Sequence, residues 1–242
     1  MLNILSIGNS FSMDATRYLH QIARADKVDL TTANLYIGGC PLHTHFKNMT
    51  LDRADYELGI NGCATKFRTS IKDALVSTEW DVVTLQQFSA QSANYETYQP
   101  YLNELVSCVK KYAPKAKIVI HRTWAYEEGS TGMAKLGYAS HADMFEDIKK
   151  AYDKAAKEIN AAYIIDSGAV MKALLENGIE KIHRDPVHAT LGTARYALGL
   201  LWYATITGND ITNNTFNDFD VPVPDEEIAI VKKCVNEVLK RN

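Results

Sequence analysis

The sequence predicts a single α/β domain built around a parallel sheet, and three observations support this prediction. Short apolar runs, typical of buried strands, alternate along the chain with amphipathic stretches of helical period. The chain has 242 residues, of which 46% are hydrophobic, so it can bury one full core. No repeat or flexible linker divides it, and one domain over residues 1–242 is expected. Alternating strands and helices favour a parallel sheet with right-handed crossovers.

The first part of the chain is expected to contribute two strands. The apolar run 4–7 ends at Gly8, and a helix with apolar residues along one side follows it to about Asp26. The second strand is predicted over 30–37, where a pair of glycines ends the apolar run. The residues that follow these glycines show no regular period.

A hairpin is expected around residues 56–67. Apolar and polar residues alternate on both sides of Asn61-Gly62. An Asn-Gly pair between alternating flanks is the strongest short-range signal for a hairpin turn. We therefore expect a small hairpin inserted beside the sheet.

The middle of the chain predicts the third and fourth strands. A helix is expected over 69–78, and the third strand follows over 82–87. A long helix over 95–112 ends before Pro114. The run 117–123 is almost continuously apolar, as is typical of a strand covered on both faces.

The last part of the chain completes the sheet. Residues 127–137 are rich in Gly, Ser and Glu and are predicted as a loop, and 140–159 is a strongly amphipathic helix. The fifth strand is expected over 162–166. Further helices are predicted over 170–176, over 190–205 and from Asp225 onward. We expect the five strands in the order 2-1-3-4-5, which makes the fold a flavodoxin-like three-layer α/β/α sandwich.

Charge and composition bound the function. The formal net charge of -3 gives no electrostatic reason to expect binding to nucleic acid or to an anionic membrane. No apolar run approaches the roughly 20 residues of a membrane-spanning helix. Because the first strand begins by residue 4, we expect a cytoplasmic protein, or an exported one if Met1 stands in place of a removed leader. The scattered cysteines, without any Cys-x-x-Cys pair, predict reduced thiols and no zinc site: Cys40, Cys63, Cys108 and Cys234.

Ser10 is the first candidate for chemistry. It lies between the first strand and its helix, at the carboxyl end of the sheet, where open α/β folds bind ligands. Such a serine can be a nucleophile if a base is near, or it can simply cap the helix.

The segment Asp185-Pro186-Val187-His188 offers the base. Pro186 restricts the backbone, so a turn is expected here. A turn of this kind brings the Asp185 carboxylate near the imidazole of His188, whose other nitrogen can then face Ser10. The alternative is a local turn with His188 on the surface.

The order of these motifs resembles that of the SGNH (GDSL-type) hydrolases, in particular a bacterial branch that begins Gly-Asn-Ser-Phe-Ser. The resemblance covers most of the chain, from residue 4 to residue 188, on short motifs. It implies a flavodoxin-like serine esterase in which Ser10 is the nucleophile, His188 the general base and then acid, and Asp185 the residue that orients His188. It also implies an oxyanion hole formed by the backbone N–H groups of Ser10 and Gly39.

The sequence departs from the family pattern at two places. Asn9 stands where an aspartate is usual, and Gln86-Gln87 stand where the family has a Gly-x-Asn-Asp block. A glutamine carboxamide can donate as asparagine does, so we predict Gln87 as the third oxyanion donor, with Gln86 as the alternative. Strand alternation allows only one of them to face the site. Gln87 can instead be a polar strand end whose carboxamide bonds to the backbone.

These features predict a serine ester hydrolase that needs no cofactor or metal. The resemblance suggests a small ester, above all O-acetylated carbohydrate, as the substrate. Two alternatives remain: hydrolysis of thioesters or lipid acyl esters by the same triad, or a non-catalytic module that binds sugar or an anion. Oligomeric state is left open.

Other polar and aromatic residues have simpler explanations. His43 and His45 face the same way if they lie in an extended loop. We expect them to form the rim of a polar pocket, and part of a metal site is the alternative. Trp124 can be the wall of a sugar site or part of the core, together with His121. No Gly-x-Gly-x-x-Gly follows a strand, which argues against a dinucleotide site.

Overall fold

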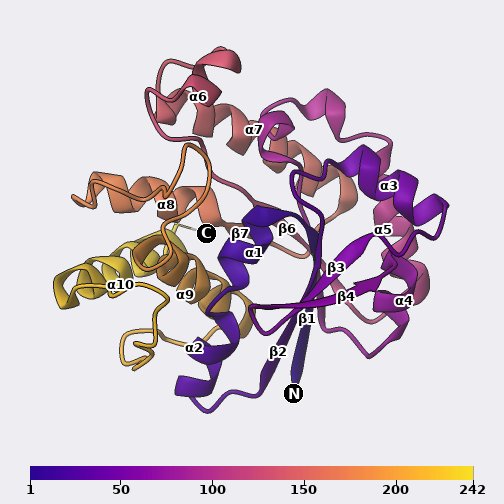
Figure 1. Cartoon of the computed structure of the whole chain (residues 1–242), viewed down its shortest axis with the longest axis horizontal. Coiled ribbons are helices and arrows are strands. Elements are labelled where there is room, and N and C mark those ends of the chain that lie inside the picture. The colour runs from indigo at the N-terminus through magenta and orange to yellow at the C-terminus, as the bar shows by residue number, and fades with distance from the viewer. Residues whose placement is uncertain (242) are drawn as a thin grey trace.

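A computed structural model describes residues 1–241 of the chain. It contains one twisted sheet with helices on both faces (Figure 1). Seven strands lie in the order β4-β3-β2-β1-β5-β6-β7. Their bounds are Leu2–Gly8 (β1), Leu30–Tyr36 (β2), Tyr56–Ile60 (β3), Cys63–Thr69 (β4), Val82–Leu85 (β5), Lys117–Arg122 (β6) and Ile164–Asp166 (β7).

The prediction of a five-stranded parallel sheet is wrong in strand number and direction. The five predicted strands pair in parallel and in the predicted spatial order, as β2-β1-β5-β6-β7. The hairpin, however, does not lie beside the sheet. Its first strand, β3, pairs antiparallel with β2, and β4 then forms the sheet edge. The sheet is therefore mixed, because the hairpin adds two antiparallel strands to the edge that β2 would otherwise leave free.

The described residues contain ten α-helices, nine of which form the two outer layers. One face of the sheet carries α1, α2, α8, α9 and α10, which contact one another; α3, α4, α5 and α7 pack on the other side (Figure 1). Their bounds are Ser10–Thr16 (α1), Leu19–Ala25 (α2), Leu42–Thr50 (α3), Ile71–Val76 (α4), Tyr101–Tyr112 (α5), Thr131–Lys135 (α6), His141–Ile159 (α7), Ser167–Glu176 (α8), Thr193–Thr207 (α9) and Asp225–Leu239 (α10).

Five segments differ locally from the prediction. The stretch without a period contains α3, and the predicted loop 127–137 contains the short α6. The first predicted helix is divided into α1 and α2. The long helix begins only at Tyr101, after two single turns of 3-10 helix, and the helix expected from 190 begins at Thr193. Short helices of five to nine residues carry little periodic signal, which explains why the pattern missed α3 and α6.

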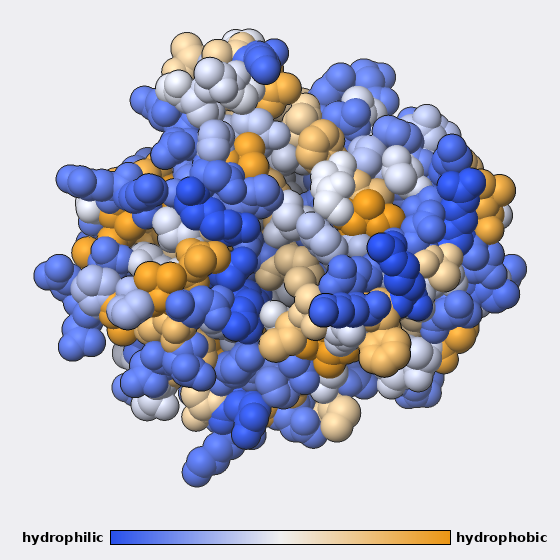
Figure 2. Space-filling model, viewed as in Figure 1, coloured by the Kyte–Doolittle hydropathy of each residue, from blue (hydrophilic) through white to orange (hydrophobic). Residues whose placement is uncertain are grey.

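The core is continuous across both faces of the sheet. Ile4, Leu5 and Ile7 on β1 are at most 1% exposed, because β1 lies in the centre with helices on both sides. Helix α9 is buried almost all round between its neighbours, in agreement with its nearly uniform apolar sequence. None of the described helices combines the length and apolarity that crossing a bilayer requires. In Figure 2 hydrophobic side chains are scattered in small groups over a mainly hydrophilic face.

Candidate active site

Ser10 is the first residue of α1, at the point where β1 ends. Asn9 caps the helix: its side-chain oxygen accepts a hydrogen bond of 3.1 Å from the backbone N–H of Phe11. Gly8 allows the tight passage into the helix, since a Cβ at this position would lie 2.3 Å from Ser12 Oγ. The cap is thus made by Asn9, and the side chain of Ser10 is left for other contacts.

Ser10, His188 and Asp185 form a continuous hydrogen-bonded chain. Ser10 Oγ lies 2.8 Å from His188 Nε2, and His188 Nδ1 lies 2.8 and 3.0 Å from the two oxygens of Asp185. The carboxylate can only accept, so Nδ1 carries the proton. Nε2 is therefore the acceptor of the Ser10 hydroxyl proton. Ser10 and His188, which are predicted to face each other although 178 positions separate them, are in contact.

The loop that carries His188 is held on several sides. Asp185 Oδ1 accepts from the backbone N–H groups of Val187 and His188 at 3.0 and 2.9 Å, which is an Asx turn. Trp124 Nε1 donates to the Val187 carbonyl at 2.9 Å. The indole of Trp124 is buried and stacks on Phe11 with a centroid distance of 4.0 Å. Trp124 is therefore part of the core and supports the loop, rather than forming an open sugar-binding wall.

The same contacts set the charge of Asp185. Burial by itself raises the pKa of this carboxyl, but the hydrogen bonds from Val187 and His188 outweigh it and lower the pKa to about 2. Asp185 is consequently ionised at every pH at which the protein is expected to work.

Two backbone N–H groups at the carboxyl end of the sheet, those of Ser10 and Gly39, have no acceptor among the described residues. Gly39 has a φ of +60°, in the left-handed region, and a Cβ there would contact the Phe88 ring at 3.4 Å. Both donors are the ones that the family resemblance implies, and their role in an oxyanion hole remains a proposal.

Gln87 does not provide a third donor, and this prediction is wrong. Its Nε2 donates to the carbonyl and hydroxyl oxygens of Thr97, at 3.0 Å each. Its Oε1 accepts from the backbone N–H groups of Leu42 and Phe88, at 2.9 and 2.8 Å. The buried carboxamide is thereby fully used to hold α3 and the loop after β5.

Gln86, the alternative, is also occupied, by a buried chain that ends at the cap of α1. Gln86 Nε2 donates to Asn9 Oδ1 at 2.9 Å, and its Oε1 accepts from His121 Nδ1 at 2.7 Å. Ser167 Oγ then donates to His121 Nε2 at 3.0 Å, and Trp202 Nε1 donates to Ser167 at 3.2 Å. Burial lowers the pKa of His121 to about 3, so the ring is neutral and its tautomer fits this direction. The chain fixes the turn that presents Ser10.

His43 and His45 do not lie in an extended loop and do not face the same way. Both lie in α3, where residues two apart point in different directions. His45 is buried against Tyr56, with Nδ1 2.9 Å from the hydroxyl. No cluster of three metal-binding side chains occurs among residues 1–241.

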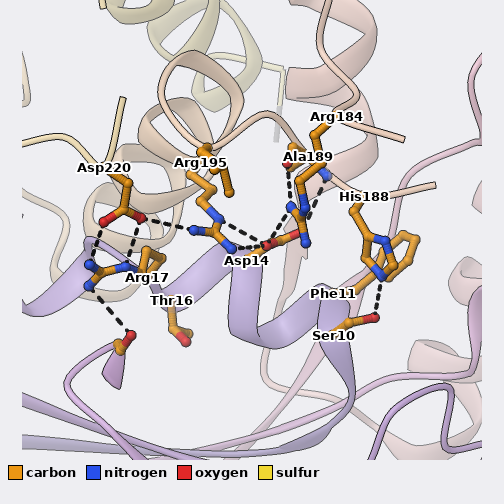
Figure 3. Close-up of polar contacts among 12 residues, drawn as sticks. Ser10, Phe11, Asp14, Thr16, Arg17, Arg184, His188, Ala189, Arg195 and Asp220 are labelled. Atoms are coloured by element: carbon orange, nitrogen blue, oxygen red, sulfur yellow. Dashed lines mark hydrogen bonds and ion pairs between the residues drawn. The ribbon is translucent and has the colours of Figure 1, made fainter. Parts of the chain in front are cut away.

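A charged cluster that the sequence analysis did not find lies next to Ser10 (Figure 3). Asp14, one helical turn after Ser10, is 1% exposed and forms ion pairs with Arg184 and Arg195 at 2.8 and 2.7 Å. Arg195 also pairs with Asp220, which in turn binds Arg17. An available signal was the charge of Asp14 between the apolar positions of α1.

A pocket of about 270 Å³ opens beside Ser10. The cluster forms one wall through Asp14, Arg184 and Arg195, and the hairpin forms another. The remaining lining residues are Ser10, Met13, Tyr36, Glu57, Gly59 and Ala64.

The chain has the fold of SGNH-type hydrolases. A candidate SGNH hydrolase from Slackia heliotrinireducens superimposes with a TM-score of 0.62 at 24% identity, covering 85% of this chain and 98% of that one. The acetyl xylan esterase AlAXEase superimposes with a TM-score of 0.52 at 15% identity, over 84% of this chain and 99% of the other.

More particularly, the chain belongs to the DUF4886 family, a domain of unknown function whose model matches residues 3–234. A DUF4886 protein from Bacteroides uniformis has a TM-score of 0.90 and 27% identity, over 99% of this chain and 95% of that one. No curated protein is detectably similar in sequence.

Proposed function

We propose that this protein is a serine ester hydrolase in which Ser10 is the nucleophile. The observation that carries the proposal is the chain of short contacts from Ser10 Oγ through His188 to the Asp185 carboxylate. A hydroxyl becomes a good nucleophile when a neutral, oriented imidazole accepts its proton. The free backbone N–H groups of Ser10 and Gly39 supply the second requirement, donors for a developing oxyanion.

The reaction proceeds in two halves. Ser10 Oγ forms a bond to the ester carbonyl carbon while His188 Nε2 takes its proton, and the negative charge collects on the carbonyl oxygen. His188 then gives the proton to the leaving alkoxide, which departs as the alcohol and leaves an acyl-enzyme. Water, deprotonated by His188, attacks the acyl group and releases the acid and Ser10. Asp185 keeps the tautomer of His188 and stabilises its cationic form.

The pocket supports a small and polar substrate. Its volume of about 270 Å³ suits a short acyl group, and its polar lining residues, the two arginines, the two acids and Tyr36, can hydrogen-bond a hydroxylated alcohol. The apolar lining residues are Met13, Gly59 and Ala64, and this small volume leaves no room for a long acyl chain. An acetyl xylan esterase with the same fold adds support for O-acetylated carbohydrate as the substrate class.

Labelling by a fluorophosphonate probe, followed by peptide mapping, tests the nucleophile. We expect one label per chain on Ser10 and none in Ser10→Ala, together with loss of hydrolysis of 4-nitrophenyl acetate. Ser12→Ala is the matched control, because Ser12 Oγ is buried against Asn9 and Asn34 and should leave the labelling of Ser10 intact. An unlabelled, inactive but folded protein would instead favour the non-catalytic binding module.

A further inference from the structure

Two arginines of the charged cluster form a wall of the pocket beside Ser10. Arg184 and Arg195 line it together with Ser10, and their side chains are 30% and 15% exposed. Arg184 also borders a second pocket, beside Thr190 and Pro222. Figure 3 shows the guanidinium of Arg184 between Asp14 and the Ser10–His188 pair. A molecule whose ester reaches Ser10 therefore lies within a pocket that contains partly exposed guanidinium groups.

Only one guanidinium nitrogen of Arg184 bonds to other residues of the described chain. Nη1 donates to both oxygens of Asp14, at 3.0 and 2.8 Å, and to the carbonyl of Ala189. Nε and Nη2 make no hydrogen bond to any residue of the described chain. These two nitrogens form one side of the planar fork, which is the side that pairs with a carboxylate through two parallel bonds.

The charge of the cluster is not balanced. Three arginines, Arg17, Arg184 and Arg195, share two carboxylates, those of Asp14 and Asp220. The buried Asp14 already accepts from both Arg184 and Arg195 and from the backbone of Ala189. The cluster thus has one positive charge in excess, in a place where desolvation by a bound ligand strengthens ionic contacts.

We propose that this pocket selects esters that carry a carboxylate, which binds to the free side of Arg184. The inference rests on the proposed esterase function and adds to it the charge of the substrate. Glu57, on the hairpin wall of the same pocket, has no side-chain partner among the described residues. Its negative charge limits how many anionic groups a substrate can carry. Glu57 repels a second anionic group and is free to accept hydrogen bonds from hydroxyls. An acylated acidic carbohydrate combines these features.

Two acetyl esters of equal shape test the charge selection. The acetyl ester of 3-hydroxybenzoate carries a carboxylate, and that of 3-hydroxybenzamide carries a neutral amide in its place. We expect the ratio of their kcat/KM values to favour the anion by about 10-fold or more, as for a charge-assisted bond. In Arg184→Gln the ratio should fall to about one, and in Arg184→Lys, which keeps the charge without the fork, it should lie between. Glu57→Gln should raise it.

Arg68→Gln is the matched control. Arg68, on β4, lies outside the charged cluster and does not line the pocket, so the ratio should remain as in the wild type. Using a ratio removes the effect of any loss of folded protein from the comparison. A wild-type ratio of one or less, or a ratio that Arg184→Gln and Arg184→Lys both leave unchanged, overturns the inference.

A binding measurement separates this inference from the esterase proposal. Calorimetry with Ser10→Ala should show that 3-hydroxybenzoate binds more tightly than 3-hydroxybenzamide, and that the additional replacement Arg184→Gln abolishes the difference. If the difference is present while no ester is hydrolysed, the esterase proposal fails and the anion site stands. If hydrolysis depends on Ser10 and neither binding nor turnover depends on the carboxylate, only the anion site fails.

Discussion

Asp185 contacts His188 twice, once at the backbone and once at the ring. The same oxygen, Oδ1, accepts the backbone N–H of His188 at 2.9 Å, while Oδ2 lies 2.8 Å from ring Nδ1. One carboxylate thus shapes the turn and orients the imidazole. The backbone bonds and the ring bond are separate contacts of the same side chain, so a substitution at Asp185 can affect one and keep the other.

Asp185→Asn should separate these two functions. Asparagine can still accept from the backbone, so the turn should form, but its amide can turn an N–H toward the ring and stabilise the wrong tautomer. We expect turnover to fall on the order of 10³–10⁴-fold with the melting temperature nearly unchanged. Steady-state kinetics and a thermal melt check this. A variant with more than a tenth of the wild-type turnover would exclude Asp185 as the orienting residue.

Gln87→Leu tests whether Gln87 is structural. Because Leu42 and Phe88 would keep buried N–H groups without their acceptor, we expect a loss of about 2–4 kcal/mol in the free energy of unfolding. Turnover per folded molecule should fall less than the roughly 10²–10³-fold expected for a lost oxyanion donor. Urea unfolding and active-site titration give the two numbers. Full stability with a large loss of turnover would restore Gln87 to the oxyanion hole.

Asp14→Asn should be strongly destabilising. Asp14 is buried and is shared by Arg184 and Arg195, so its neutralisation leaves both guanidiniums without their common partner. The expected cost is about 3–5 kcal/mol. Asp220→Asn is the comparison, since this carboxylate is 26% exposed and its loss should cost about 1 kcal/mol. Equal effects of the two substitutions in urea unfolding would contradict this assignment.

Stability should fall in mild acid because of buried neutral histidines. Burial lowers the pKa of His45 and of His121 to about 3, whereas an unfolded histidine titrates near 6.5. Between these values the unfolded chain binds more protons, so the free energy of unfolding decreases as the pH falls from 6.5 toward 3. From pH 7 to pH 5 each ring should contribute a loss of about 2 kcal/mol.

His45→Gln should remove its share of this loss, measured by urea unfolding at pH 7 and pH 5. Tyr56→Phe serves as the control, because it deletes the hydrogen bond to His45 without removing the ring. It should lower the stability by a similar amount at both pH values. An unchanged pH dependence in His45→Gln would show that other groups cause the acid sensitivity.

Local signals in the sequence were sufficient for most of the strands and for the turn at residue 185. The hairpin, too, could be predicted from Asn61-Gly62, where Asn61 has the positive φ that such turns require. Its pairing with β2 could not be predicted. An exposed strand edge pairs with another strand through backbone groups, and such pairing does not change the pattern of side chains in the hairpin. The number of strands was therefore wrong although each strand was found.

Apart from the contact between Ser10 and His188, long-range polar contacts could not be predicted from the sequence. Gln86 and Gln87 are adjacent amides with the same chemistry, and only their partners, His121 and Thr97, distinguish them. Arg184 lies 170 positions from Asp14, and nothing near Asp14 indicates which cation will neutralise it. Such pairings follow from how the chain returns across the sheet.

The hairpin is attached to the rest of the sheet only through β2, yet Glu57, Gly59 and Ala64 face the space where a substrate would rest. The proposed nucleophile and base, Ser10 and His188, come from other segments, at the end of β1 and before α9. Exchange of the few hairpin residues between relatives would consequently transplant substrate preference while preserving the reaction itself. The β3–β4 hairpin can therefore vary among members of the family without changing the proposed catalytic residues Ser10, Asp185 and His188.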